Sequence, residues 1–359
     1  MGKRIAIVGV GALGGYVGGH LARAGHDVTL IDFWPENIET IRSKGLRLDG
    51  LSEEERFTVT DVAALHVSDV QSLARQAPIE VAIVAVKSYD TEWATTMIRQ
   101  YLAPNGFVVS LQNCLNEERI AGIVGWGRTV GAIASMISVD MSEAGYVMRT
   151  VPKMGDRYTV FRVGEVHGRI STRVQDLVEM FRLVDSAKAT TNLWGERWSK
   201  LVLNGMANGV SAATGLSVAA GYHNDPVRRF AIRLGGEAVR VGQALGYELE
   251  KIGKFEPEQW ALAGEEIASP GSGGAEALAA IEADQTKGSP PNDRDDVRRP
   301  SMAQDVLKGR RTEIEFINGY IAEKAAEIGM EAPTHVRITD LVKRVEKGEL
   351  QPSPALLEG

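Results

Sequence analysis

Three polar residues on one predicted helix carry the strongest chemical signal in this sequence. Lys200, Asn204 and Asn208 recur every fourth residue between Leu193 and Val210, a spacing that places them on one face of a helix. The remaining residues of this segment are apolar or small, as in a buried helix. One amine and two amides on such a helix need hydrogen-bond partners, and a ligand in a cleft between two domains would supply them. A buried amide network or a solvated helix face would explain the same pattern without a ligand.

Two further polar residues follow predicted buried strands. Lys87 comes directly after the apolar run 81–86, and Asn113 follows the apolar run 107–111. Ligands of open parallel sheets bind beyond the carboxyl ends of the strands. We therefore expect Lys87 to contact a cofactor or substrate, and Asn113 to bind the nicotinamide ribose or the substrate. The alternatives are a solvated lysine and an asparagine that only forms a turn.

The element that must position these groups is the N-terminal strand–turn–helix–strand unit. An apolar run at residues 5–8 leads into Gly9, Gly11 and Gly14, a helix-compatible stretch follows, and a second apolar run ends at Asp32. This order is that of a dinucleotide-binding βαβ unit. The first glycine permits the tight turn, the second lets a pyrophosphate approach the backbone, and the third lets the helix pack on the sheet. The helix N-terminus, from Ala12 and Leu13, would offer N–H groups to the phosphates.

The acid after the second strand favours one form of the coenzyme. Asp32 follows Gly14 by 18 residues, close to the spacing of a carboxylate that binds ribose hydroxyls. Such a carboxylate would repel a 2′-phosphate, so we expect NAD(H), with NADP(H) possible. A nearby arginine, Arg42 or Arg47, would reverse this preference.

Composition excludes several other classes of function. The chain of 359 residues is 44% hydrophobic and has a net charge of −7, which provides no electrostatic footprint for nucleic acid or an anionic membrane. A single cysteine, Cys114, fits a reducing compartment, and no segment reaches the roughly 20 apolar residues of a membrane span. We expect a cytoplasmic protein that acts on a small molecule, binds no metal and forms a homodimer.

The alternation of strands and helices stops near Lys188, so the sequence predicts an α/β domain over 1–188 and a helical domain over 189–359. Residues 264–299 are rich in glycine, serine and proline around a short helix at 276–284, and we expect a mobile insertion there; a lid or an oligomer contact is the alternative. A helical region is predicted from Ser301, a residue suited to capping, to Ile328. Within it either Glu313 or Glu315 would face the cleft. A last helix is expected over 331–346, and a loose tail after Gly348.

Several blocks together resemble the ketopantoate reductase family over nearly the whole chain. The matching blocks are Gly9-Val10-Gly11-Ala12-Leu13-Gly14, Val86-Lys87, Leu111-Gln112-Asn113, Trp198-Ser199-Lys200-Leu201 with Asn204 and Asn208, Ser301-Met302-Ala303-Gln304-Asp305-Val306 and Gly309-Arg310-Arg311-Thr312-Glu313-Ile314. The resemblance implies a Rossmann-type domain followed by an all-α domain similar to the C-terminal domain of 6-phosphogluconate dehydrogenase. It also implies reduction of a 2-oxo acid, 2-dehydropantoate to pantoate, in pantothenate biosynthesis.

The resemblance assigns roles to individual residues. Lys200 is implied as the general acid and Glu313 as its catalytic partner, which selects Glu313 over Glu315. The implied substrate-binding residues are Asn113, Asn204, Asn208 and Ser301. The implied cofactor-binding residues are Gly9, Gly11, Ala12, Leu13, Gly14, Asp32, Lys87, Asn113 and Glu313. A lysine with an ordinary pKa of about 10.4 is protonated at neutral pH, so it can protonate the alkoxide that forms when hydride reaches a ketone.

Three positions depart from the family pattern. Asp32 stands where NADP(H)-dependent members carry a basic or neutral residue, and Cys114 replaces the usual glycine after Gln-Asn. Arg298-Arg299-Pro300 precede Ser301 where asparagines are common, which would favour a larger or more acidic 2-oxo acid. Two alternatives stay open, a related 2- or 3-hydroxy acid or opine-type dehydrogenase and a non-catalytic dinucleotide sensor.

Overall fold

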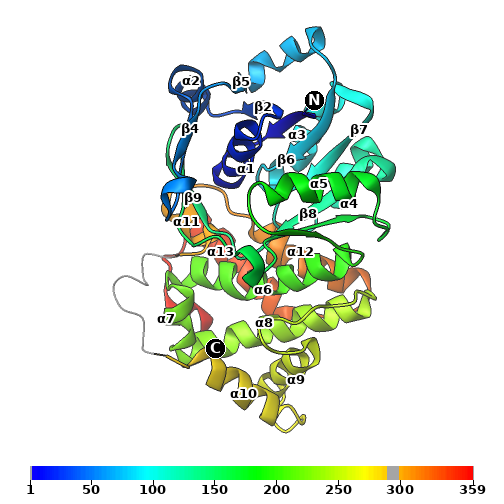
Figure 1. The fold of residues 1–359 in the computed structure, drawn as a ribbon. Coiled ribbons are helices and arrows are strands. Elements are labelled where there is room, and N and C mark those ends of the chain that lie inside the picture. The colour runs from blue at the N-terminus through cyan, green and yellow to red at the C-terminus, as the bar shows by residue number, and fades with distance from the viewer. Residues whose placement is uncertain (1, 289–298, 359) are drawn as a thin grey trace. The chain divides into compact units, whose positions relative to one another are not determined.

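The chain divides into two compact units, Met1–Leu193 and Trp194–Gly359. The computed structural model describes residues 2–288 and 299–358 (Figure 1). The predicted domain boundary at 188 falls inside the last strand of the first unit, β12 (Ala187–Ala189). Within the described residues, no helix is long and apolar enough to cross a membrane.

The first unit is built on an eight-stranded sheet. Its strands are β1 (Arg4–Val8), β2 (Asp27–Asp32), β5 (Ala63–His66), β6 (Ile79–Val84), β7 (Leu102–Ser110), β8 (Thr129–Ala134), β11 (Phe161–Glu165) and β12. They lie in the order β12-β11-β8-β7-β6-β1-β2-β5. All neighbours are parallel except β11 and β8. The stretch β5-β2-β1-β6-β7-β8 has the 3-2-1-4-5-6 order of doubly wound dinucleotide-binding sheets. In this order the side of the sheet to which successive strands are added changes between β1 and β6.

Helices cover both faces of this sheet and bury its apolar runs. They are α1 (Ala12–Arg23), α2 (Pro35–Lys44), α3 (Thr91–Arg99), α4 (Glu117–Val124) and α5 (Thr172–Arg182). One core cluster joins the sheet to α1 and α5 through residues such as Val17 and Phe181. A second cluster joins the other face to α3 and α4 through Ile98 and Ile120. The carboxyl ends of the parallel strands are therefore the edge left for a ligand.

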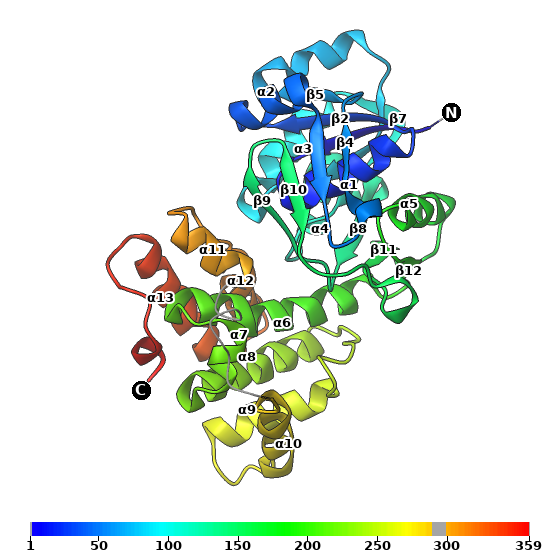
Figure 2. The same ribbon diagram turned by 60° about the vertical axis from the view of Figure 1, so that its left-hand side comes forward.

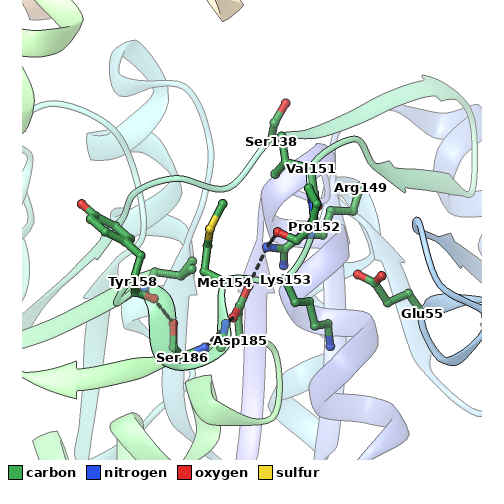
Figure 3. A network of polar contacts seen from close by, with 12 residues as sticks. Glu55, Ser138, Arg149, Val151, Pro152, Lys153, Met154, Tyr158, Asp185 and Ser186 are labelled. Carbon is green, nitrogen blue, oxygen red and sulfur yellow. Dashed lines mark hydrogen bonds and ion pairs between the residues drawn. The ribbon is translucent and has the colours of Figure 1, made fainter. Parts of the chain in front are cut away.

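A small second sheet packs on α1 (Figure 2). It has the order β4-β3-β10-β9, with β3 (Leu46–Asp49), β4 (Phe57–Val59), β9 (Val139–Glu143) and β10 (Tyr146–Arg149). Arg149, at the end of β10, is fully buried and pairs with Asp185 at 2.5 Å. Its guanidinium also donates to the carbonyl oxygens of Val151 and Pro152 (Figure 3). This buried network fixes the small sheet to the segment that enters β12.

In the part of the second unit that the structure describes, the regular elements are helices, apart from one isolated bridge between Ile252 and Phe255. Its helices are α6 (Leu193–Thr214), α7 (Val218–Tyr222), α8 (Asp225–Ala244), α9 (Pro257–Ala268), α10 (Ala275–Gln285), α11 (Ser301–Leu307), α12 (Ile314–Glu327) and α13 (Pro333–Glu346). The predicted Rossmann-type domain and the predicted all-α domain are both confirmed.

Three local predictions need correction. The short helix predicted at 276–284 is confirmed as α10, and because its Ile281 is fully buried, this part is packed rather than mobile; residues 289–298 lie outside the described part. The tail after Gly348 is not loose, because it forms a short 3₁₀ helix, Pro354–Leu357, that buries Leu357. The predicted helix 301–328 is interrupted after Leu307 at Gly309, whose φ is +60°.

The predicted turn at residues 104–106 lies within a strand. β7 pairs with β6 at Ile79–Leu102 and again at Val81–Phe107, with a register shift between the two pairs. Residues 103–106 are therefore a bulge in β7, and strand pairing resumes after it.

Candidate active site

The glycine turn after β1 has the geometry that a dinucleotide requires. Gly9 adopts a φ of +98°, and a Cβ there would lie 2.7 Å from the backbone nitrogen of Val86. A Cβ on Gly14 would overlap the Gly9 carbonyl oxygen, so only glycine lets α1 begin this close to the turn. The position of a Cβ on Gly11 is open, with no atom within 4 Å. The turn thus combines a tight backbone with free space above its middle glycine.

The N-terminus of α1 lies at this turn, and its first N–H groups have no partner within the helix. Gly11 is the N-cap and contributes no side chain. The first helical hydrogen bond is donated by the N–H of Gly15 to the Gly11 carbonyl oxygen at 2.8 Å. The N–H groups of Ala12 and Leu13 therefore come before the first hydrogen bond of the helix. These donors and the positive end of the helix dipole fit the pyrophosphate of a dinucleotide.

Asp32 lies at the end of β2, beside the same turn. Its Oδ2 accepts the Val10 N–H at 2.5 Å and its Oδ1 accepts the Trp34 N–H at 2.8 Å. The side chain is buried, and this burial raises the pKa of the carboxyl above its usual value, although the backbone hydrogen bonds oppose the shift. A carboxylate has about four acceptor positions, so these backbone contacts leave room for a ribose hydroxyl.

The two arginines that would reverse the coenzyme preference are engaged elsewhere. Arg42 donates to the carbonyl oxygen of Ala64 and to the carboxylates of Glu39 and Asp69. Arg47 pairs with Asp49 at 2.9 Å. Neither guanidinium is directed at Asp32.

Lys87 and Asn113 are brought together at the ends of adjacent strands. Gln112 donates from Nε2 to the carbonyl oxygen of Val86 at 2.9 Å and to the hydroxyl of Thr91 at 2.7 Å. This buried amide ties the residue before Lys87 to the residue before Asn113. Both side chains are partly exposed, at the edge of the sheet where the glycine turn also lies. The first unit therefore gathers its predicted cofactor residues at one edge.

The polar stripe of the second unit lies on α6. Lys200 and Asn204 are partly exposed, and Asn208 is 7% exposed. The Nδ2 of Asn204 is buried, and it has no hydrogen-bond partner among the described residues. Because an unsatisfied buried donor costs about 1–3 kcal/mol, this amide is suited to hold a ligand acceptor.

Trp198 anchors the helix that carries this stripe. Its ring is fully buried, and its Nε1 donates to the Ala238 carbonyl oxygen of α8 at 2.8 Å. A Cβ on Gly242 would overlap the indole, so a glycine on α8 makes room for the tryptophan. Two residues further on, Lys200 therefore projects from a fixed part of α6.

Glu313 is distinguished from Glu315 by its surroundings. Glu313 is the N-cap of α12 and is 5% exposed. Glu315 is exposed and forms ion pairs with Arg311 at 3.0 Å and with Lys343 at 2.7 Å. The turn before α12 is held by Glu346, which accepts the Thr312 N–H at 2.7 Å. These contacts favour Glu313 as the functional carboxylate.

Ser301 does not cap its helix as the sequence predicts. It is the first residue of α11, the N-cap is Pro300, and the Ser301 side chain is exposed. Because Pro300 takes the N-cap position, Ser301 lies inside the helix, where its side chain does not accept the N–H groups of the first turn. The hydroxyl is thus available for a ligand.

Sequence reasoning missed one residue that shapes the cofactor half. Asn37 of α2 is fully buried, and its Nδ2 donates to the Val10 carbonyl oxygen at 3.0 Å while its Oδ1 accepts the Gly145 N–H at 2.8 Å. No spacing pattern marks this position, because the partner Gly145 is remote in sequence. The one signal in the sequence that could have indicated Asn37 is a polar residue at a buried position of α2, beside Ile38 and Ile41.

The order of the strands, the glycine turn at their point of reversal and the acid after β2 define the first unit as a Rossmann-type dinucleotide-binding domain. A helical unit that bears a lysine and amides follows it in the chain, and this combination is that of a nicotinamide-dependent oxidoreductase. The family follows from direct comparison. The model described as "Ketopantoate reductase PanE/ApbA" matches residues 5–157. The model described as "Ketopantoate reductase PanE/ApbA C terminal" matches residues 192–346. The chain belongs to the ketopantoate reductase family, as the sequence resemblance predicts.

Individual relatives support this assignment over almost the full length. The 2-dehydropantoate 2-reductase of Archaeoglobus fulgidus is 27% identical, and the match covers 96% of this chain and 99% of that protein. The crystal structure of a PanE/ApbA family ketopantoate reductase from Ralstonia eutropha aligns with a TM-score of 0.74 and 25% identity, covering 97% of this chain and 99% of that one. A D-mandelate dehydrogenase solved with NADH and anilino(oxo)acetate shares the fold, with a TM-score of 0.75, 20% identity and coverage of 96% and 99%.

Proposed function

We propose that this protein reduces a 2-oxo acid to a 2-hydroxy acid with NADH, with 2-dehydropantoate as the first candidate substrate. The observation that carries the proposal is the buried, unpartnered Nδ2 of Asn204 on the helix face of Lys200. A 2-oxo acid carries carboxylate and carbonyl oxygens, which are the acceptors that such a donor requires. The names of the relatives over nearly the whole chain point to the same substrate class.

The catalytic roles follow from the chemistry of the side chains. Bound reduced nicotinamide supplies hydride to a carbonyl carbon. The Lys200 ammonium donates a proton to the carbonyl oxygen and stabilises the negative charge that develops there. Asn204, Asn208 and Ser301 donate hydrogen bonds that orient the substrate, together with Asn113. Glu313 orients the Lys200 side chain and the substrate relative to each other. The product is the 2-hydroxy acid.

The coenzyme preference rests on Asp32. Its carboxylate accepts two backbone N–H groups beside the glycine turn, so it is held where an adenine ribose would lie. A 2′-phosphate would meet this negative charge, and Arg42 is occupied by Glu39 and Asp69. Lys87 and the N-terminus of α1 serve the remaining phosphates. These features support NADH over NADPH.

The test is a steady-state assay of 2-dehydropantoate and a panel of bulkier and dicarboxylic 2-oxo acids, with NADH and with NADPH. We expect turnover with NADH, and we expect Lys200→Ala to lower kcat by about 10²–10⁴-fold, the range of general acid catalysis. The matched control is Lys254→Ala, which removes a lysine whose side chain is 76% exposed and whose partner is Asp284.

Each outcome decides between the candidate functions. Turnover of a bulkier acid but not of 2-dehydropantoate would replace the named substrate and keep the mechanism. Turnover with NADPH alone would overturn the role of Asp32. Cofactor binding without turnover of any oxo acid would favour a dinucleotide sensor instead. The homodimer and the cytoplasmic location stay predictions, and light scattering of the purified protein tests the former.

A further inference from the structure

Helix α6 and helix α12 approach each other at two glycines. Gly205 and Gly209 of α6 lie one residue after Asn204 and Asn208. A Cβ on Gly209 would lie 2.9 Å from Asn318 Oδ1 and 3.1 Å from Cδ1 of Ile314, the first residue of α12. The residues that precede this contact are Asn208 on one helix and Glu313 on the other. The close approach therefore brings the polar stripe to the N-terminus of α12.

A buried asparagine joins the two helices by a hydrogen bond. Asn318 of α12 is fully buried, and its Nδ2 donates to the Gly205 carbonyl oxygen at 3.0 Å. The same Nδ2 donates to Nδ1 of His335 at 3.2 Å. Because Gly205 is the neighbour of Asn204, this bond fixes the α6 backbone at the stripe itself.

The histidine is held in turn by α8. His335, also fully buried, donates from Nε2 to the Leu234 carbonyl oxygen at 2.9 Å. With Nε2 as the donor, the neutral ring presents Nδ1 as the acceptor that Asn318 needs. Glu237 of α8 accepts the N–H groups of Thr334 and His335, at 3.0 and 3.3 Å from Oε2. The start of α13 is therefore tied to α8, and His335 cannot turn away from Asn318.

We propose that Asn318 and His335 are positioning residues that set the separation between the α6 amides, Asn204 and Asn208, and the carboxylate of Glu313. Apolar side chains would pack these helices as tightly, but only directional hydrogen bonds specify one register of α12 along α6. The inference rests on the proposed function, because its kinetic consequence concerns the 2-oxo acid. Both residues are fully buried, and they act through α6 and α12 rather than by contact with substrate or cofactor.

The test compares variants that break the link with variants that only lower stability. Asn318→Ala removes the donor to Gly205, and His335→Leu removes the acceptor for Asn318. His335→Asn keeps an acceptor at the place of Nδ1, because the Asn oxygen occupies the equivalent branch, but it loses the bond to Leu234. Trp260→Phe is the matched control, since it deletes another buried donor, to the Ile252 carbonyl oxygen at 3.0 Å.

Two measurements report the positioning. We expect Asn318→Ala and His335→Leu to raise KM for the 2-oxo acid about tenfold or more, to lower kcat, and to leave the affinity for NADH unchanged. We expect faster hydrogen exchange of the backbone amides 204–209 in the same two variants, without any ligand. His335→Asn and Trp260→Phe should lower the melting temperature while KM and this exchange stay near wild type.

The outcomes separate this inference from the proposed function. Unchanged exchange at 204–209 in Asn318→Ala overturns the positioning role, whatever the substrate proves to be. A rise in KM for Trp260→Phe equal to that of Asn318→Ala also overturns it, because general destabilisation would then explain both. A wild-type protein that reduces no 2-oxo acid refutes the proposed function, and the exchange measurement still decides whether Asn318 and His335 fix α6.

Discussion

Asp32 and Asn37 hold the same residue of the glycine turn, Val10, through its backbone N–H and its carbonyl oxygen. Asp32 Oδ2 accepts the Val10 N–H at 2.5 Å, and Asn37 Nδ2 donates to the Val10 carbonyl oxygen at 3.0 Å. Asn37 also accepts the Gly145 N–H from the turn between β9 and β10. The turn that would carry the pyrophosphate is therefore fixed to β2, to α2 and to the small sheet before any cofactor binds.

Removing Asn37 should weaken cofactor binding. In Asn37→Ala the Val10 carbonyl and the Gly145 N–H both lose their partner, at about 1–3 kcal/mol for each buried group. The turn would lose part of its preorganisation, and we expect Kd for NADH to rise roughly tenfold, about 1.4 kcal/mol. Fluorescence titration with NADH measures this. Asn224→Ala is the control, because it deletes the cap of α8 in the other unit; equal Kd values in both variants would contradict the idea.

The cofactor half could be predicted from sequence because its elements are local. The glycine turn, the apolar strands and Asp32 lie within 32 residues, and their spacing dictates a βαβ unit. Asn37 could not be found in this way, since its partner Gly145 is 108 residues away. The choice of Glu313 over Glu315 likewise depends on Lys343, which pairs with Glu315 from a different helix.

Two of the failed predictions have separate physical reasons. Glycine, serine and proline between 264 and 299 indicated a mobile insertion, but Gly264 packs against Gly236, where a Cβ would lie 2.9 Å from its Cα. Gly264 thus allows close packing of α9 on α8, a tertiary effect that composition does not reveal. Ser301 has a residue type suited to capping, and the fixed backbone of Pro300 occupies the cap position instead.

Cys114 should tolerate glycine better than any branched residue. It has a φ of +66° and stands where relatives are expected to carry glycine. A left-handed backbone costs a residue with a side chain about 1–2 kcal/mol, and β-branched residues suffer most. We expect Cys114→Gly to be near neutral, because the relief of strain offsets the loss of buried side-chain atoms. We expect Cys114→Val to lower the free energy of unfolding by about 1–2 kcal/mol or more, as measured by urea denaturation. Equal stability of the Val and Gly variants would refute the explanation.

Two buried histidines should make the fold less stable in weak acid. Burial lowers the pKa of His20 to about 3, with help from the charges of Lys153 and Arg23, and burial lowers that of His335 to about 4. An unfolded histidine has a pKa of about 6.5. Below that pH the histidine is therefore protonated in the unfolded chain but stays neutral in the folded one. Stability therefore falls as the pH drops from about 6.5 towards the folded pKa values.

The size of this effect can be measured on each histidine separately. Each should contribute a loss of about 2 kcal/mol between about pH 7 and about pH 5. Urea denaturation at both pH values, on wild type and on His20→Gln, gives the contribution of His20 as the difference between the pH dependences of the two proteins' stability. Carboxyls such as Asp185, whose pKa is lowered mainly by hydrogen bonds from Ser186 and Arg149 against the effect of burial, contribute equally to both proteins. An identical pH dependence in the two proteins would show that His20 binds its proton as readily in the folded state as in the unfolded chain.

The buried pair of Arg149 and Asp185 should show strong coupling between its two members. Both side chains are at most 1% exposed, and the bond length is 2.5 Å. Arg149→Met leaves a carboxylate buried without its cation, and we expect a loss of about 3–5 kcal/mol. Asp185→Asn leaves the guanidinium without its anion and should cost a similar amount. In the double variant no unpaired charge remains, so its loss of stability should be well below the sum of the two single losses.

An exposed pair gives the control, since Lys251→Ala at the pair with Glu256 should cost at most about 1 kcal/mol of stability. Urea denaturation of the wild type, the two single variants and the double variant completes the cycle, and simple additivity would mean that the network in Figure 3 acts by packing alone.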